Sequence, residues 1–184
     1  MAYKGLDSVI ETLKGSISFS WLSRAWGLAD SITDMREEKP YVFPACYATT
    51  DGDPISMMPS DIWGAFCFWI RNGDAKFINP EYGQLPLVVY PVSLIFYMDI
   101  SKIHSNYKET RSKITEDIFN YFYTIHGGCV LTPVKFIEDD ITKVYEGFTL
   151  TDLDNKWKIY PRWCCRMDAE VTFRYVCYTT NLYA

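Results

Sequence analysis

Residues 165–177 read Cys-Arg-Met-Asp-Ala-Glu-Val-Thr-Phe-Arg-Tyr-Val-Cys and give the strongest structural signal in the chain. From residue 165 to 175, apolar side chains stand at the odd positions and polar ones at the even positions. Successive side chains of a β-strand point to opposite faces of the sheet. The alternation therefore predicts a strand with one buried face and one polar face.

Three more segments are strand candidates. Residues 62–71 and 92–99 are apolar at both alternations, which is typical of strands covered on both faces. Residues 129–137 form a third candidate, and the turn sequence Asn72-Gly73-Asp74 allows a hairpin after the first. We expect a mainly antiparallel sheet built from residues 62–70, 92–98, 129–136 and 165–177.

Helical periodicity appears in three places. Residues 106–126 predict a long helix packed across one face of the sheet, and residues 1–39 predict two N-terminal helices. The chain carries no repeat or linker, so we expect one α+β domain over 1–184, with a helical segment at 1–39 and the sheet plus long helix at 40–184. Loops 49–61 and 72–84 are expected to project from it. The residues expected to line the helix faces are Leu6, Val9, Ile10, Leu13, Trp21, Trp26, Ile114, Ile118, Phe122 and Ile125.

The composition narrows the class of protein. Of 184 residues, 17% are aromatic, and the net charge of −5 argues against a dedicated nucleic-acid binder. No apolar signal core follows the N-terminus, and the longest apolar stretch, 85–98, is too short for a membrane helix, so we expect a soluble protein made in a cytoplasm. The six cysteines have no C-x-x-C spacing and are expected to be buried free thiols.

Catalytic motifs are scarce. The only two histidines are His104 and His126, and the sequence contains no G-x-S-x-G elbow or phosphate-binding glycine loop. His126 and Cys129 could form a thiol–imidazole pair, but we interpret them as a glycine-capped helix end.

Other site hypotheses rest on carboxylates and tryptophans. Asp99 ends an apolar strand and could join Glu138, Asp139 and Asp140 in a nuclease-like metal site. The sequence Asp51-Gly52-Asp53 resembles the opening of a calcium loop, but it is interpreted as a turn. The pairs Trp63 with Trp69 and Trp157 with Trp163 could form a sugar platform, and core packing is the competing interpretation. We expect no catalytic residues, metal or cofactor.

Two stretches carry a resemblance to a known family. The first is Leu94-Ile95-Phe96-Tyr97-Met98-Asp99-Ile100, and the second is Ile159-Tyr160-Pro161-Arg162-Trp163-Cys164-Cys165-Arg166-Met167. With the helix between them, which carries Arg111, Ile114, Asp117 and Ile118, they resemble the neck and tail-connector proteins of tailed bacteriophages, especially crAss-like phages. The resemblance covers residues 41–178 and departs from the family pattern at Cys164-Cys165.

The resemblance implies a tail-terminator-like fold and a structural role. The protein would form a ring in the virion neck or tail, assembled in the host bacterial cytoplasm, and would connect the portal to the tail around the DNA channel. Its partners would be further copies of itself in a sixfold or twelvefold ring, the portal and other neck proteins. DNA would only pass through, and no membrane is involved. A non-virion adaptor module and a small nuclease-like enzyme are the alternatives.

The apolar content also predicts where copies would meet. The N-terminal helices and the two loops carry more large apolar side chains than one sheet needs, and monomers seldom expose such patches. The expected subunit interface consists of Leu6, Val9, Ile10, Leu13, Trp21, Trp26, Ile55, Met57, Met58, Phe77, Ile78 and Tyr82.

Overall fold

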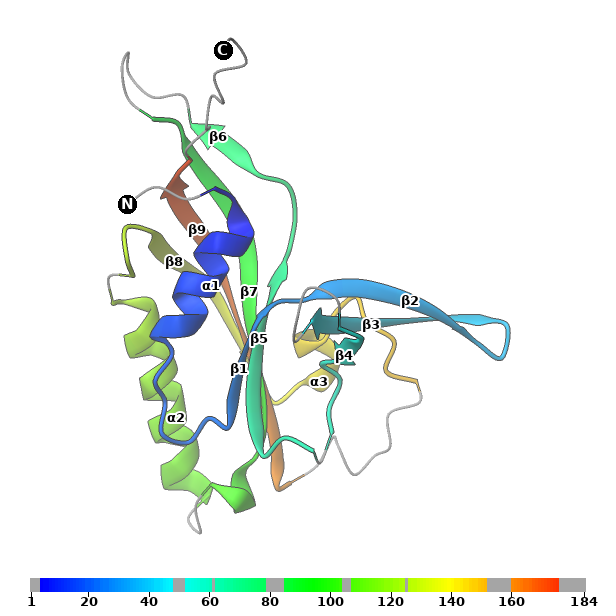
Figure 1. Ribbon diagram of the computed structural model, residues 1–184. Coiled ribbons are helices and arrows are strands. Elements are labelled where there is room, and N and C mark those ends of the chain that lie inside the picture. Colours follow the sequence, from blue (N-terminus) through cyan, green and yellow to red (C-terminus); the bar gives the residue numbers. More distant parts are fainter. Residues whose placement is uncertain are drawn as a thin grey trace.

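The computed structural model describes residues 4–47, 52–60, 62–78, 85–103, 107–124, 126–151 and 160–175. It is an α+β protein, mostly sheet, in which a six-stranded sheet is joined by a three-stranded one (Figure 1). The order of neighbours in the large sheet is β1-β5-β7-β9-β8, with β6 also paired to β7, and the small sheet is β2-β3-β4. The elements are α1 (Leu6–Ser16), β1 (Arg24–Leu28), β2 (Asp30–Arg36), β3 (Lys39–Tyr47), β4 (Pro54–Ser56), β5 (Ala65–Arg71), β6 (Lys76–Ile78), β7 (Leu87–Asp99), η1 (Ile100–Lys102), α2 (Tyr107–Phe122), β8 (Val130–Glu138), α3 (Ile141–Val144) and β9 (Arg162–Arg174).

The centre of the large sheet is the antiparallel pair β7 and β9. The two strands have 13 residues each and pair along their whole length, from Leu87 opposite Arg174 to Asp99 opposite Arg162. The strand predicted from the alternation at 165–177 is confirmed as β9, although it begins three residues earlier. The segments predicted at 62–71, 92–99 and 129–137 are β5, β7 and β8. Among the described strands, only β1 pairs in parallel, with β5.

One face of the large sheet is covered by α1 and α2 (Figure 1). Ile10 and Leu13 of α1 and Ile118 of α2 are fully buried there against apolar residues of the strands. The apolar residues whose spacing predicted α1 are therefore the ones that α1 buries. The helix expected at 106–126 is shorter, since α2 ends at Phe122, and Ile125 lies outside the described residues.

The opposite face, here called the second face, is covered over part of its length by the small sheet and α3 (Figure 1). Phe66 and Phe68 of β5 and Tyr97 of β7 are buried in this second cluster. Tyr145, which follows α3, is fully buried and donates its hydroxyl hydrogen to the carbonyl oxygen of Met57 at 3.2 Å. This bond ties α3 to the segment that follows β4.

The prediction of a second N-terminal helix over Trp21–Ile32 is wrong. That segment contains β1 and the beginning of β2 instead. The apolar residues of this segment have helical spacing, but contacts with distant parts of the chain determine its conformation. β1 pairs with β5 at the edge of the large sheet, and Trp26 packs into the second cluster. The expectation that loop 49–61 projects also fails in its described part, where β4 forms and Met57 and Met58 are buried.

The outer edge of β8 is protected against further pairing. Pro133 has no N–H to donate, the register shifts between Pro133 and Lys135, and a lysine follows the shift. Proline, bulge and lysine are the devices by which proteins blunt an exposed edge strand. The free edge of β2 carries none of these interruptions: its seven residues pair with β3 in an unbroken register.

Candidate functional site

The β2–β3 hairpin is an arm that projects away from the large sheet (Figure 1). Its seven cross-strand pairs run from Asp30 opposite Ala45 to Arg36 opposite Lys39. Six of the seven β2 residues are exposed, and Met35 has 63% of its surface accessible. At about 3.3 Å per residue the arm is about 23 Å long. At the base of the arm, β3 buries Ala45 and Cys46 against the body, whereas β2 and the outer part of the hairpin contribute little to the core.

The arm ends in a strained acidic turn. Glu37 and Glu38 form the two-residue connection, and both have positive φ angles, 47° and 63°. Positive φ at both central residues defines a type I′ turn, for which Asn-Gly is strongly preferred because other L-residues are disfavoured there. Each such residue costs about 1–2 kcal/mol, and this kind of strain is concentrated at functional positions. The two glutamates are therefore the first candidate functional residues.

A buried polar cluster lies on the second face, next to the part covered by the small sheet. Arg166 of β9 has only 8% of its surface exposed and Ser93 of β7 has none. The Arg166 Nε donates to Ser93 Oγ at 3.0 Å and to Asp168 Oδ1 at 2.6 Å. Ser93 also donates to Asp168 and accepts from the Asn72 side-chain amide. We call Asn72, Ser93, Arg166 and Asp168 the Arg166 cluster.

The strand register aligns Ser93 and Asp168 in one cross-strand row, and Arg166 lies two residues before Asp168 on the same face of β9. Asp168 is directly opposite Ser93 on one side and Lys135 on the other. Lys135 is exposed. The Arg166 side chain is 10% exposed, and its Nε forms an ion pair with Asp168 Oδ1. Arg166 and Asp168 thus form a nearly buried ion pair that Ser93 completes by hydrogen bonding to both.

The expected subunit interface is only partly available on the surface. Phe77 and Ile78 are exposed, at 67% and 50%. Trp21 and Ile55 are half-buried, and Tyr82 lies outside the described residues. The remaining seven are buried by the same chain, so they need no second copy to cover them and the sequence argument for placing them at an interface no longer applies. They are Leu6, Val9, Ile10, Leu13, Trp26, Met57 and Met58.

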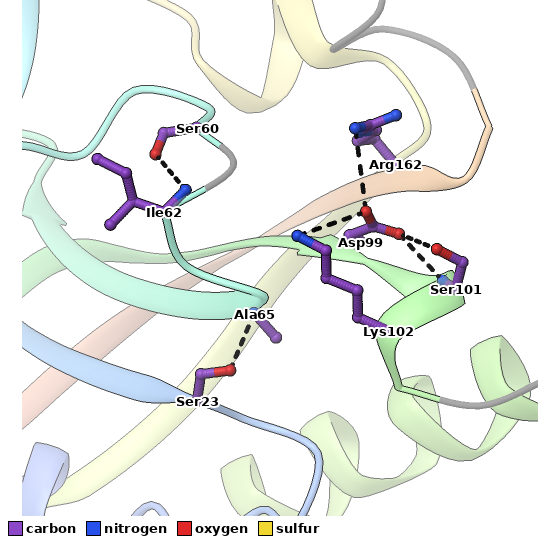
Figure 2. Close-up of polar contacts among 8 residues, drawn as sticks. All are labelled: Ser23, Ser60, Ile62, Ala65, Asp99, Ser101, Lys102 and Arg162. Carbon is purple, nitrogen blue, oxygen red and sulfur yellow. Dashed lines mark hydrogen bonds and ion pairs between the residues drawn. The ribbon is translucent and has the colours of Figure 1, made fainter.

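The structure explains Asp99 as a capping residue rather than a metal ligand. Figure 2 shows its carboxylate between Ser101, Lys102 and Arg162. It accepts hydrogen bonds from the Ser101 backbone N–H at 3.1 Å and from the Ser101 hydroxyl at 2.6 Å, and so caps η1. The ammonium of Lys102 and a guanidinium nitrogen of Arg162 each lie 3.9 Å away. Nearby, Ser23 and Ala65 join β1 to β5 by two hydrogen bonds (Figure 2).

The other acidic residues of the nuclease hypothesis have separate partners. Arg111 pairs with both Glu138 and Asp139, and its guanidinium lies 5.2 Å from the ring centre of Trp163. Asp140 is the N-cap of α3. In the part of the chain that the structure describes, no three His, Cys, Asp or Glu side chains are grouped closely enough to hold a metal ion. Asp51 lies outside the described residues.

The thiol–imidazole hypothesis is not supported by the geometry. Cys129 donates its S–H to the backbone carbonyl oxygen of His126 at 2.9 Å, while the imidazole ring bonds elsewhere. His104 lies outside the described residues. The five described cysteines are free and buried, as expected, and burial raises the pKa of Cys46 and Cys164 to about 12. Thiols of this kind are poor nucleophiles.

The tryptophans Trp63 and Trp69 do not form a platform. Trp63 packs in the second cluster, where its ring lies 5.6 Å from that of Trp26, whereas Trp69 is fully buried on the first face. Their equal parity was misleading because Trp63 precedes β5 and does not follow its alternation. Trp163 is buried, and Trp157 lies outside the described residues.

The arm and the Arg166 cluster are the features that sequence reasoning missed. A signal for the cluster was present, because Ser93 is the single polar residue within the apolar run 92–98. In the described residues, none of the helices combines the length and the apolar character needed to cross a bilayer. The chain matches no protein-family model, no curated protein and no solved structure.

Proposed function

We propose that this protein is a structural subunit that assembles through its β2–β3 arm into a ring in the neck or tail of a tailed bacteriophage. The observation that supports self-assembly is the arm itself, which projects from the body, leaves β2 and its outer part exposed and ends in a strained turn at Glu37 and Glu38 (Figure 1). An exposed strand edge of this kind can pair with another chain.

In the assembled state, the projecting arm supports a ring rather than a closed pair of copies. An arm that binds a different surface of the next copy makes a head-to-tail contact, and head-to-tail contacts close into rings when the rotation between copies allows it. The sixfold or twelvefold order, the portal as a neighbour and the place in the virion follow from the resemblance to connector proteins. A net charge of −5 suits a channel wall, which must let DNA slide without gripping its phosphates.

Electron microscopy tests the proposed function. The purified protein is imaged by negative stain alone and with the portal protein of the same virus, and purified virions are imaged at the neck. We expect closed rings of sixfold or twelvefold symmetry in at least one mixture and a ring of this chain at the neck. Isolated copies under all conditions, or a location on the capsid surface, would overturn the proposal.

A further inference from the structure

The hydrogen-bonding pattern of the hairpin leaves alternate residues of β2 facing its free edge. In a hairpin with a two-residue turn, the residues that flank the turn exchange backbone hydrogen bonds, and so does every second pair behind them. The flanking pair here is Arg36 and Lys39. Counted back from this pair, the N–H and C=O groups of Ser31, Thr33 and Met35 point away from β3.

The other side of β3 agrees with this pattern. Val42 stands opposite Thr33, and its N–H donates to the Thr149 hydroxyl at 2.9 Å. The Val42 carbonyl oxygen accepts from the Thr149 backbone N–H at 2.8 Å. Pro40 and Pro44 stand opposite the other two edge-facing residues, and proline has no N–H to donate. The residues of β3 that face this row therefore hold none of its backbone groups.

The free edge of β2 can accept one more strand. It contains no proline and no bulge, six of its seven residues are exposed, and the arm projects clear of the large sheet (Figure 1). The Met35 N–H donates to the adjacent Asp34 carboxylate at 2.8 Å, an exposed local bond that a pairing strand can replace. Main-chain hydrogen bonds hold a strand added to such an edge, and the side-chain pairs decide which strand fits.

The charges of β2 favour a second copy of the same strand, running antiparallel. Edge-facing residues pair only with edge-facing residues, so such a copy can shift only in steps of two residues. With Thr33 opposite Thr33 of the other copy, all seven residues of each strand are paired. In this register Arg36 of each copy stands opposite Asp30 of the other, so the contact contains two opposite-charge pairs.

Other registers are disfavoured by like charges or by length. A shift of one step in one direction places Asp30 opposite Asp34 of the other copy, and a shift in the other direction places the two Asp34 residues opposite each other. Like charges directly opposite destabilise a strand pair, whereas opposite charges stabilise it. Larger shifts leave at most three residues of each seven-residue strand paired. The register centred on Thr33 is therefore the one that combines full length with favourable charges.

Both members of the favoured charge pair are accessible. Asp30 is exposed, and among the described residues its carboxylate takes part in no ion pair. The Arg36 side chain is 50% exposed, with its Nε 3.8 Å from Asp34 and its guanidinium 3.6 Å from the ring centre of Tyr41. Asp30 and Arg36 are six positions apart, so they share one face of β2, and both charge pairs lie on the same face of the combined sheet.

We infer that copies outside the ring pair through the free edges of β2, antiparallel and centred on Thr33, with Arg36 of each copy opposite Asp30 of the other. The pairing goes beyond the proposed ring function. It uses the same patch on both copies, so it is closed by two of them. The pair holds both arms against each other, and it must open before an arm can bind a different surface of the next copy in a ring.

Charge reversal tests the pairing. Asp30→Arg turns both charge pairs into contacts between two cations, and Arg36→Asp turns both into contacts between two anions. We expect either variant alone to self-associate about tenfold or more weakly than the wild type, as measured by analytical ultracentrifugation. A mixture of the two variants restores both opposite-charge pairs and should form a heterodimer. Lys113→Glu is the control, since this lysine is 69% exposed on α2 and should leave self-association unchanged.

The double variant Asp30→Arg/Arg36→Asp keeps the test decisive if a single variant fails to fold. It exchanges the two charges within one strand, so it should self-associate like the wild type. A wild type that is monomeric at every concentration would overturn the inference. So would a mixture that associates no better than its single variants, or a double variant that has lost self-association. The proposed function is decided separately by imaging the neck, where the absence of a ring would overturn it even if pairs form in solution.

Discussion

Ser16 and His126 are separated by 110 positions in the sequence, yet Ser16 Oγ lies 3.0 Å from His126 Nδ1. The other ring nitrogen, Nε2, lies 2.7 Å from the carbonyl oxygen of Tyr121 and must donate to it. In the neutral ring Nδ1 is then an acceptor, and its neighbour is the Ser16 hydroxyl, whose single hydrogen is shared with the carbonyl oxygen of Leu13 at 2.7 Å. The imidazole therefore joins the last residue of α1 to the last turn of α2.

Replacing this histidine should loosen the packing of the two helices. We expect His126→Ala to lower the free energy of unfolding by about 1–3 kcal/mol, because the buried partners of the ring lose their hydrogen bonds. Thr124→Ala is the control, since it removes an exposed side-chain hydrogen bond nearby and should change stability by less than about 0.5 kcal/mol. Equal urea midpoints for the two variants would show that the imidazole does not join the helices.

The face of α2 is tested by charge insertion. Ile118 is fully buried against the large sheet, so Ile118→Asp should place an unpaired carboxylate in the core and cost about 4 kcal/mol or more. Ser112→Asp adds the same charge to an exposed position of the same helix and should be nearly neutral. Thermal unfolding followed by circular dichroism compares them. An Ile118→Asp variant that melts with the wild type would mean that α2 is rotated.

Substitutions in the turn at the arm tip should increase the stability of the protein. We expect Glu37→Asn/Glu38→Gly to raise the free energy of unfolding by about 1–2 kcal/mol, because both new residues tolerate positive φ. Glu37→Gln/Glu38→Gln removes the same charges but keeps the strain, so it should give no comparable gain. Chemical denaturation measures both. A gain in the glutamine variant alone would assign the cost to charge rather than to backbone strain.

Asp140 predicts an acid-dependent contribution to stability. Hydrogen bonds from Thr142 and Lys143 lower its pKa from the ordinary 3.8 to about 2. A carboxyl whose pKa is lower in the folded state stabilises the fold above its ordinary pKa, and this contribution disappears as pH falls through about 2. The stability difference between wild type and Asp140→Ala should therefore be present at neutral pH and shrink between about pH 4 and 2. NMR titration of the Asp140 carboxyl gives the pKa directly, and an ordinary value would refute the capping assignment.

Local pattern predicted β5, β7, β8 and β9 of the large sheet and helix α1, because each of these elements buries a face that its own periodicity marks. The segment at Trp21–Ile32 was mispredicted because its apolar residues suit a helix as well as two strands, and pairing with β5 is a non-local interaction. The candidate site depends on such interactions even more. Arg166 and Ser93 are 73 positions apart, and only the register of β7 with β9 brings them together. The positive φ angles at Glu37 and Glu38 follow from a hairpin that the sequence alone did not predict.

The full-length pairing of β7 with β9 has a consequence for how the chain folds. Their nearest ends, Asp99 and Arg162, are separated by α2, β8 and α3, so the middle of the large sheet forms only after a long segment has been closed into a loop. Pairing that requires long loop closure slows folding into the millisecond-to-second range that is typical of sheet-rich domains, about a thousandfold slower than helical bundles. During that interval β7 exposes the edge that β9 later covers. A newly made copy is thus most vulnerable to aggregation before β9 arrives, and dilution or a chaperone should improve its yield.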